Sequence, residues 1–223
     1  MFQKDLNRQF NYSLKGKTYR PSIAEARLIY DGKITRKFWG QKAYEPYKKS
    51  LKNTHYWEQK RRCAYCRVLL NPDAYWEDLD HVVPQSVRGE WIFYPKNLIV
   101  TCTACNRLKN SNTTLTNPNT KVFPSYSKGF IIFNPHFDVW SDNFEIHKGL
   151  FLRAKTGTKG PATYSHCHLF RYQIIVKYAD EQRIWSVQTM RRLTHRLRSE
   201  QKGSREYNSI LKAIDHMLQK KGH

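Results

Sequence analysis

Four of the chain's five cysteines stand in two closely spaced pairs, a pattern typical of metal binding. The pairs are Cys63 with Cys66 and Cys102 with Cys105, and two residues separate the members of each pair. Two such C-x2-C knuckles can present four thiolates tetrahedrally to Zn²⁺. The 35 residues between the pairs exceed the ~15–20 residues usual in a zinc ribbon. We therefore expect a zinc site that encloses an insertion with a task of its own.

Two disulfide bonds are the alternative use of four cysteines. The N-terminal residues contain neither an apolar segment nor a small-residue cleavage site of a secretory signal, which predicts a cytoplasmic protein with reduced thiols. No apolar run approaches the ~18 residues of a membrane span, so no membrane partner is expected. Zinc is the favoured interpretation. Because four protein ligands leave no open position on such a zinc, catalysis must use other residues.

The insertion carries residue types that suit phosphodiester hydrolysis. Residues 79–86 read LDHVVPQS, and Asn106 directly follows the second cysteine pair. The carboxylate of Asp80 and the amide oxygen of Asn106 suit Mg²⁺ or Mn²⁺, hard cations that complete their shell with water and substrate phosphate. The imidazole of His81 has an ordinary pKa of ~6.5 and can take a proton from water at neutral pH.

These motifs, in this order, resemble the HNH endonuclease family. The resemblance rests on C-x-Y-C, then D-H-V-V-P, then N-L, then C-x2-C-N-x2-K, and the D-H-V-V-P-Q-S run is also similar to the HNH domain of RNA-guided CRISPR nucleases. It implies a ββα-metal fold in which His81 is the general base and Asp80 and Asn106 bind the catalytic metal. It also implies that Asn97 braces the catalytic loop. Asn106 replaces the final His of the motif, a substitution that the family commonly accepts.

Each of these residues alone has an ordinary structural explanation. An Asp-His pair is most often a surface hydrogen bond, Asn97 before Leu98 is most often a turn cap, and Asn106 could simply begin a helix. Their joint spacing favours the catalytic interpretation. The roles of two residues near Asn106 stay open. Asn110 lies four residues after Asn106, on the same helix face, and is a rival ligand. Lys109 is either a phosphate contact or a solvated side chain.

The side chains of the insertion need a small unit to position them. Apolar patterning predicts a strand over 75–82, a loop through Gly89, a strand over 98–102 and a helix that opens near Thr103. The cysteine pairs would clamp the two ends of this unit together.

The predicted fold class is α+β, in three segments. Residues 1–62 form a basic N-terminal arm with a short helix after Pro21 and a lead-in helix from 45 or 46 to about 62. Residues 63–111 form the HNH core with its zinc site. Residues 112–223 form an extension, with short strands within 129–155 and two helices broken near Gly203 over 181–221.

The charge distribution indicates a polyanionic partner. The net charge is +21, from 39 basic and 18 acidic residues. Residues 1–62 contain sixteen Lys/Arg and five Asp/Glu, residues 63–111 contain five of each, and residues 112–223 contain eighteen Lys/Arg and eight Asp/Glu. Two basic segments that flank a neutral core suit nucleic acid, most simply double-stranded DNA. One expected C-terminal helix carries four arginines that suit DNA contact or a solvated face equally well: Arg191, Arg192, Arg196 and Arg198.

A further resemblance concerns the C-terminal segment. The stretch FNPHFDVWSDNFEI at 133–146, with Gly149 and residues 161–171, is similar to HNH proteins of bacterial anti-phage systems, such as the Septu-type nuclease that works beside an ATPase. The resemblance implies antiviral defence with a separate ATPase subunit, since this chain has no nucleotide-binding P-loop.

The sequence therefore predicts metal-dependent hydrolysis of DNA, with two alternatives. One is a zinc-binding nucleic-acid adaptor without turnover. The other is an HNH nuclease acting on RNA, because aromatic residues among the lysines of the arm could stack unpaired bases as well as pack a core: Phe38, Trp39, Tyr44 and Tyr47.

Overall fold

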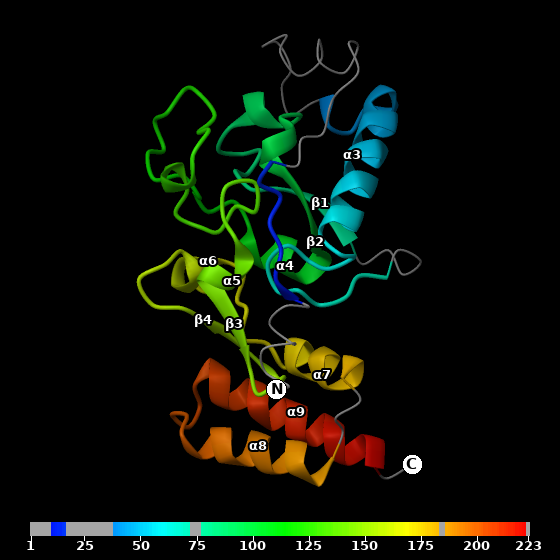
Figure 1. The fold of residues 1–223 in the computed structure, drawn as a ribbon, viewed down its shortest axis with the longest axis vertical. Helices are drawn as coiled ribbons and strands as arrows, with labels where there is room; N and C mark the ends of the chain where they lie inside the picture. Colours follow the sequence, from blue (N-terminus) through cyan, green and yellow to red (C-terminus); the bar gives the residue numbers. More distant parts are fainter. Residues whose placement is uncertain (1–9, 17–37, 72–76, 183–185, 222–223) are drawn as a thin grey trace.

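The structure is a computed structural model that describes residues 10–16, 38–71, 77–182 and 186–221. It has a mixed α/β fold with small antiparallel sheets (Figure 1). The expected helix after Pro21 lies outside the described residues. No helix in the described ranges is long and apolar enough to cross a membrane.

A strand pair followed by a helix forms the part of the fold between the cysteine pairs. Strand β1 (Glu77–His81) pairs antiparallel with β2 (Leu98–Cys102), so that Asp80 lies opposite Ile99. Helix α4 (Thr103–Lys109) follows β2 at once and contacts both strands. The loop between the strands contains the short turns η4 (Gly89–Trp91) and η5 (Pro95–Asn97). The expected order of strand, loop, strand and helix is confirmed over these elements.

Helix α3 (Glu45–Glu58) lies against β2 in the upper part of Figure 1, preceded by the turn η2 (Lys42–Tyr44). Pro46 suits its first turn, where a backbone N–H has no helical partner. The helix ends four residues before the expected position, and Lys60 and Arg61 turn the chain with left-handed φ angles of 58° and 57°. A buried cluster fixes α3 to the loop and β2: Tyr44, Tyr47, Leu51, Ile92, Phe93 and Leu98.

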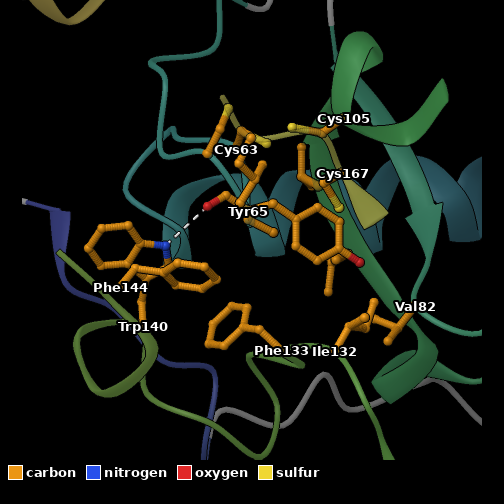
Figure 2. Close-up of a cluster of buried hydrophobic side chains, with 14 of the residues drawn as sticks. Cys63, Tyr65, Val82, Cys105, Ile132, Phe133, Trp140, Phe144 and Cys167 are labelled. Carbon is orange, nitrogen blue, oxygen red and sulfur yellow. Dashed lines mark hydrogen bonds between the residues drawn. The ribbon is translucent and has the colours of Figure 1, made fainter. Parts of the chain in front are cut away.

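The largest buried cluster takes residues from all three predicted segments. The hydroxyl of Tyr12 donates to the carbonyl of Ala64 at 2.7 Å. The indole N–H of Trp140 donates to the carbonyl of Tyr65 at 3.1 Å, and Figure 2 shows this bond beside the cysteines. Cys167, the fifth cysteine, is fully buried in the same cluster. The stretch 133–146 thus packs against the first cysteine knuckle.

The C-terminal segment forms a second antiparallel pair and a helical layer. Strand β3 (Phe144–His147) pairs with β4 (Phe151–Ala154), as expected within 129–155. The two predicted C-terminal helices are α8 (Val187–Arg198) and α9 (Arg205–Lys221), which pack on each other at the lower end of Figure 1. Elements that the sequence did not predict are η6 (Ser127–Gly129), α5 (Trp140–Asn143), α6 (Gly160–His166) and α7 (Tyr172–Glu181).

Candidate active site

The four paired cysteines converge as expected. Their Sγ atoms all lie within 4.8 Å of one another, and those of Cys66 and Cys102 are 3.8 Å apart. A tetrahedral Zn²⁺ with bonds of ~2.3 Å places its sulfur atoms about 3.8 Å apart, whereas a disulfide requires about 2.05 Å. All four cysteines are free. The cluster could therefore bind a metal ion, and its donor set fits zinc.

Residues outside the knuckles support the cysteine cluster. The guanidinium of Arg171 donates to the Sγ of Cys105 at 3.2 Å, and the Tyr178 hydroxyl donates to the carbonyl of Cys66. Two guanidinium nitrogens of the fully buried Arg67 donate to the carbonyls of Phe10 and Gln59 at 2.8 and 2.9 Å. Four thiolates around one divalent ion would carry excess negative charge, and the guanidinium of Arg171 lies where it would offset part of that charge.

A cavity of about 930 Å³ opens between α3, β1 and α4. Asp80 and Asn106, the proposed ligands of the catalytic metal, and His81, the proposed base, all line this cavity, because β1 and α4 face each other here. The zinc ligands and Asn97 are not among its lining residues. The acidic, amide and imidazole side chains that matter for chemistry are Asp78, Asp80, His81, Gln85, Asn106 and Asn110.

The imidazole of His81 is held in one orientation. Its Nε2 lies 2.9 Å from the carbonyl oxygen of Ile92, so Nε2 carries the proton and Nδ1 keeps its lone pair. The side-chain amide of Gln85 lies 3.3 Å from Nδ1, and the ring of Trp39 packs edge-on with centroids 4.4 Å apart. Burial is the main cause that lowers the pKa of His81 to about 4; the hydrogen bond to Ile92 acts in the opposite direction, and the Lys109 ammonium acts in the same direction as burial. The ring is therefore neutral at pH 7.

Asp80 is buried with one oxygen paired and one without a partner. Its Oδ1 lies 3.3 Å from the Nζ of Lys109, while Oδ2 accepts no hydrogen bond. Burial raises the pKa of Asp80 to about 6, although Lys109 acts in the opposite direction. Leaving a buried carboxylate oxygen unpartnered is unfavourable, so this atom is suited to receive a cation.

Lys109 is neither a solvated side chain nor a free phosphate contact in this structure. Only 1% of it is exposed, and its Nζ donates to the carbonyl of His81 at 2.8 Å as well as pairing with Asp80. It lies on the last turn of α4, which packs on β1 and brings the ammonium inward. Lys109 therefore ties the helix to the strand that carries the proposed base.

Asn106 is oriented by a carboxylate that the sequence analysis did not single out. Its Nδ2 donates to the Oδ2 of Asp78 at 3.0 Å, which leaves the amide oxygen of Asn106 available as a ligand. Asp78 lies two residues before Asp80 on β1, and side chains two apart on a strand share a face. That spacing, Asp-x-Asp within a predicted strand, was the signal that could have identified it.

Asn110 does not share a helix face with Asn106, contrary to expectation. Helix α4 ends at Lys109, and Asn110 adopts φ 53° as its C-cap, so the i, i+4 relation does not apply. Its ψ of −151° places it outside the left-handed helical region, in a strained conformation that non-glycine residues rarely adopt. The side chain of Asn110 still lines the cavity.

Asn97 lies behind the cavity and joins the two ends of the loop between β1 and β2. It is fully buried. Its Oδ1 accepts from the backbone N–H of Val83 at 2.7 Å, and its Nδ2 donates to the carbonyls of Val83 and Trp91 at 3.2 and 3.1 Å. The loop that contains Ile92, the partner of His81, is therefore held closed by one side chain.

Two other histidines lie close together away from the cavity. His55 and His136 are buried with ring centroids 5.2 Å apart, and His136 hydrogen-bonds the carbonyl of Leu98 at 3.0 Å. Burial lowers the pKa of His55 to about 4 and that of His136 to about 3. Both rings are neutral core residues at pH 7.

Comparison with known proteins identifies no relative of this chain. No family model, no curated protein and no solved structure matches it. The chemistry of the site is therefore inferred from the geometry of its own side chains.

Proposed function

We propose that this chain is a metal-dependent endonuclease of the HNH type that hydrolyses phosphodiester bonds in DNA. The observation that carries the proposal is the arrangement at the end of β1. There a neutral imidazole, fixed through its Nε2, lines an open cavity next to a buried carboxylate with one unpartnered oxygen. A base and a cation ligand side by side are the two parts that phosphodiester hydrolysis lacks in water.

Asp80 and Asn106 would hold the catalytic metal. The unpartnered Oδ2 of Asp80 and the amide oxygen of Asn106, which Asp78 orients, are hard oxygen donors on one cavity wall. Mg²⁺ or Mn²⁺ bound there would stabilise the charge that develops on the phosphoryl group and on the departing 3′ oxygen. Zn²⁺ in the cysteine cluster would support the fold, since four thiolates leave it no open position.

The residues of the chain itself prepare the nucleophile. The Nδ1 of His81 carries the lone pair because Nε2 is committed to the carbonyl of Ile92, and the attacking water would take the place of the Gln85 amide that lies 3.3 Å from Nδ1. A pKa of about 4 keeps that lone pair unprotonated at neutral pH, and it also makes the imidazole a weaker base than one that titrates near pH 7. Asn97 keeps the Ile92 carbonyl in place through the loop, and Lys109 fixes the backbone of His81 from the other side.

The surface around the cavity suits a phosphate backbone. Lys48 and Lys52 at its rim pair with Glu45 and Glu77. Lys49 and Arg107, also at the rim, are exposed and form no ion pair within the described part of the chain. With a net charge of +21, the chain favours long-range attraction to DNA, and the unpaired rim cations would contact its phosphates.

Burial of Tyr44 and Tyr47 in the arm supports duplex DNA over unpaired RNA as substrate. Tyr44 and Tyr47 are buried in the cluster around α3, and the hydroxyl of Tyr47 donates to the carbonyl of Phe93 at 2.6 Å. Phe38 and Trp39 pack against the same cluster. The two tyrosines are therefore engaged in packing rather than presented for stacking on bases, whereas the half-buried Trp39 also lines the cavity.

A cleavage assay with His81→Ala tests the proposal. Purified protein is incubated with plasmid, single-stranded DNA and RNA in Mg²⁺, Mn²⁺ or EDTA. We expect metal-dependent cleavage of DNA by the wild type and a loss of about 10²–10⁴-fold in His81→Ala, because the variant lacks a base but no metal ligand. His195→Ala is the matched control, since His195 is an exposed histidine on α8 far along the chain.

Three outcomes would contradict the proposal or change its substrate. Cleavage by His81→Ala at the wild-type rate shows that His81 is not the base. Tight DNA binding without cleavage under any metal indicates the zinc-binding adaptor. Cleavage of RNA alone reassigns the substrate. The proposed defence role, with a separate ATPase subunit, is tested by asking whether a candidate partner ATPase, added with ATP, raises the cleavage rate in the same assay.

A further inference from the structure

A second cavity, of about 550 Å³, lies in the C-terminal layer between β4, α6, α8 and α9. None of its lining residues belongs to the proposed active site. Cavities of ~300–1,000 Å³ are the usual size for small-molecule ligands. The nature of its lining shows which ligand would fit.

Three arginines from three separate elements converge on this cavity. Arg153 comes from β4, Arg196 from α8 and Arg205 from the first turn of α9. Arg196 pairs with Glu200, and Glu206 is the one carboxylate among the lining residues. Within the described residues, Arg153 and Arg205 form no ion pair with a carboxylate. Guanidinium groups that share a cavity repel each other, so an anion between them would be stabilising.

His168 adds a neutral donor to the same wall. Its Nδ1 lies 3.0 Å from Nη1 of Arg205, and because arginine only donates, Nδ1 accepts and the ring proton is on Nε2. Burial, and then the charges of Arg205 and Arg171, lower the pKa of His168. The contact also holds the side chain of Arg205 at the cavity. Guanidinium and imidazole N–H groups together are the donors that phosphate oxygens require.

Aromatic rings form the rest of the wall. Tyr164 and Phe170 line the cavity, and their ring centroids lie 6.4 Å apart. An aromatic ring face next to phosphate donors suits a ligand that joins a phosphate to an aromatic base.

We propose that this cavity binds the phosphate group of a nucleotide, either free or at the end of a nucleic-acid strand. Arg153, Arg205 and the imidazole of His168 hold the phosphate, and the base lies against Tyr164. The site is independent of the proposed nuclease chemistry, because no residue of the cavity at β1 takes part. The inference therefore stands or fails separately from the proposed function.

Calorimetric titration of the full chain tests this site. The probes are inorganic phosphate, deoxyadenosine monophosphate and a 5′-phosphorylated oligodeoxynucleotide, all in EDTA to prevent cleavage. The proteins are wild type, Arg153→Gln, Arg205→Gln and the matched control Arg191→Gln. Arg191 is an exposed arginine on α8 that does not line the cavity. We expect about tenfold weaker binding of deoxyadenosine monophosphate in each cavity variant, and wild-type binding in the control.

Competition between the probes distinguishes a free nucleotide from a strand end, and the control variant shows whether binding is specific. Displacement of the monophosphate by the oligonucleotide identifies a strand end, and independent binding identifies a free nucleotide. Equal affinity in all four proteins, or an equal loss in Arg191→Gln, overturns the proposal because binding would then be non-specific attraction to a basic surface. His81→Ala should bind the monophosphate as the wild type does. Thermal melting and metal content confirm that each variant is folded.

Discussion

Replacing Asn97 with alanine should destabilise the chain and slow cleavage together. The fully buried side chain makes three hydrogen bonds, two to Val83 and one to Trp91. At about 1 kcal/mol for each bond, the variant loses about 3 kcal/mol of unfolding free energy, and more if the freed backbone groups find no water. For a chain of this size, each kcal/mol corresponds to about 2–4 °C, so the midpoint of thermal unfolding should fall by about 6–12 °C.

The effect on rate follows from the same loop. Ile92, whose carbonyl orients His81, lies between Val83 and Asn97 in the chain. If the loop loosens, the imidazole loses its fixed orientation, and cleavage should fall even below the new melting temperature. Circular dichroism melting and plasmid cleavage at 20 °C measure the two effects. The control is Asn53→Ala on α3, an exposed asparagine whose loss should change stability by no more than ~0.5 kcal/mol.

Two results would refute this reasoning. A midpoint within about 2 °C of the wild type would show that the three bonds contribute little net free energy. A large fall in stability with an unchanged cleavage rate at 20 °C would show that Asn97 supports the fold but does not position His81.

Other perturbations separate the two metals and the buried histidines. Cys105→Ser should lose bound zinc and unfold at 25 °C, as measured by metal analysis and circular dichroism; a folded, zinc-free variant would contradict a structural zinc. Mild EDTA should stop cleavage without changing the melting curve, because it removes the catalytic metal and leaves the zinc in place. Excess Mn²⁺ should partly restore cleavage by Asn106→Ala. Unfolding of the protein by mild EDTA would contradict the assignment of a structural zinc and a separate catalytic metal. Because burial lowers the pKa values of His55 and His136, stability should be complete above pH ~6.5 and decline as pH falls towards about 4. In His136→Gln the stability should decline less between pH ~6.5 and pH ~4 than in the wild type. Equal declines in the two proteins would contradict a contribution of His136 to the pH dependence.

Local patterns in the sequence predicted much of the site. Apolar patterning on each side of the loop predicted β1, β2 and α4. Helix α7 was not predicted, because its run through Ile174, Ile175 and Val176 is rich in β-branched residues that favour strands. Packing on β4 and α9 overrides that preference. The stretch 133–146 contributes core packing, as its buried Trp140 shows.

The sequence by itself determined that the four paired cysteines would converge and that Asp80 would lie beside His81 at the end of one strand. Short spacings constrain geometry directly, because few backbone conformations span them. Examples are the two residues between the members of each cysteine pair and the one residue between Asp78 and Asp80 on β1. Only the tertiary structure decided that Lys109 is buried on Asp80 and that Asn106 pairs with Asp78. It also decided that Arg153 and Arg205 share a cavity. Those contacts join segments far apart in the chain, and their formation depends on how whole elements pack, which no local spacing specifies.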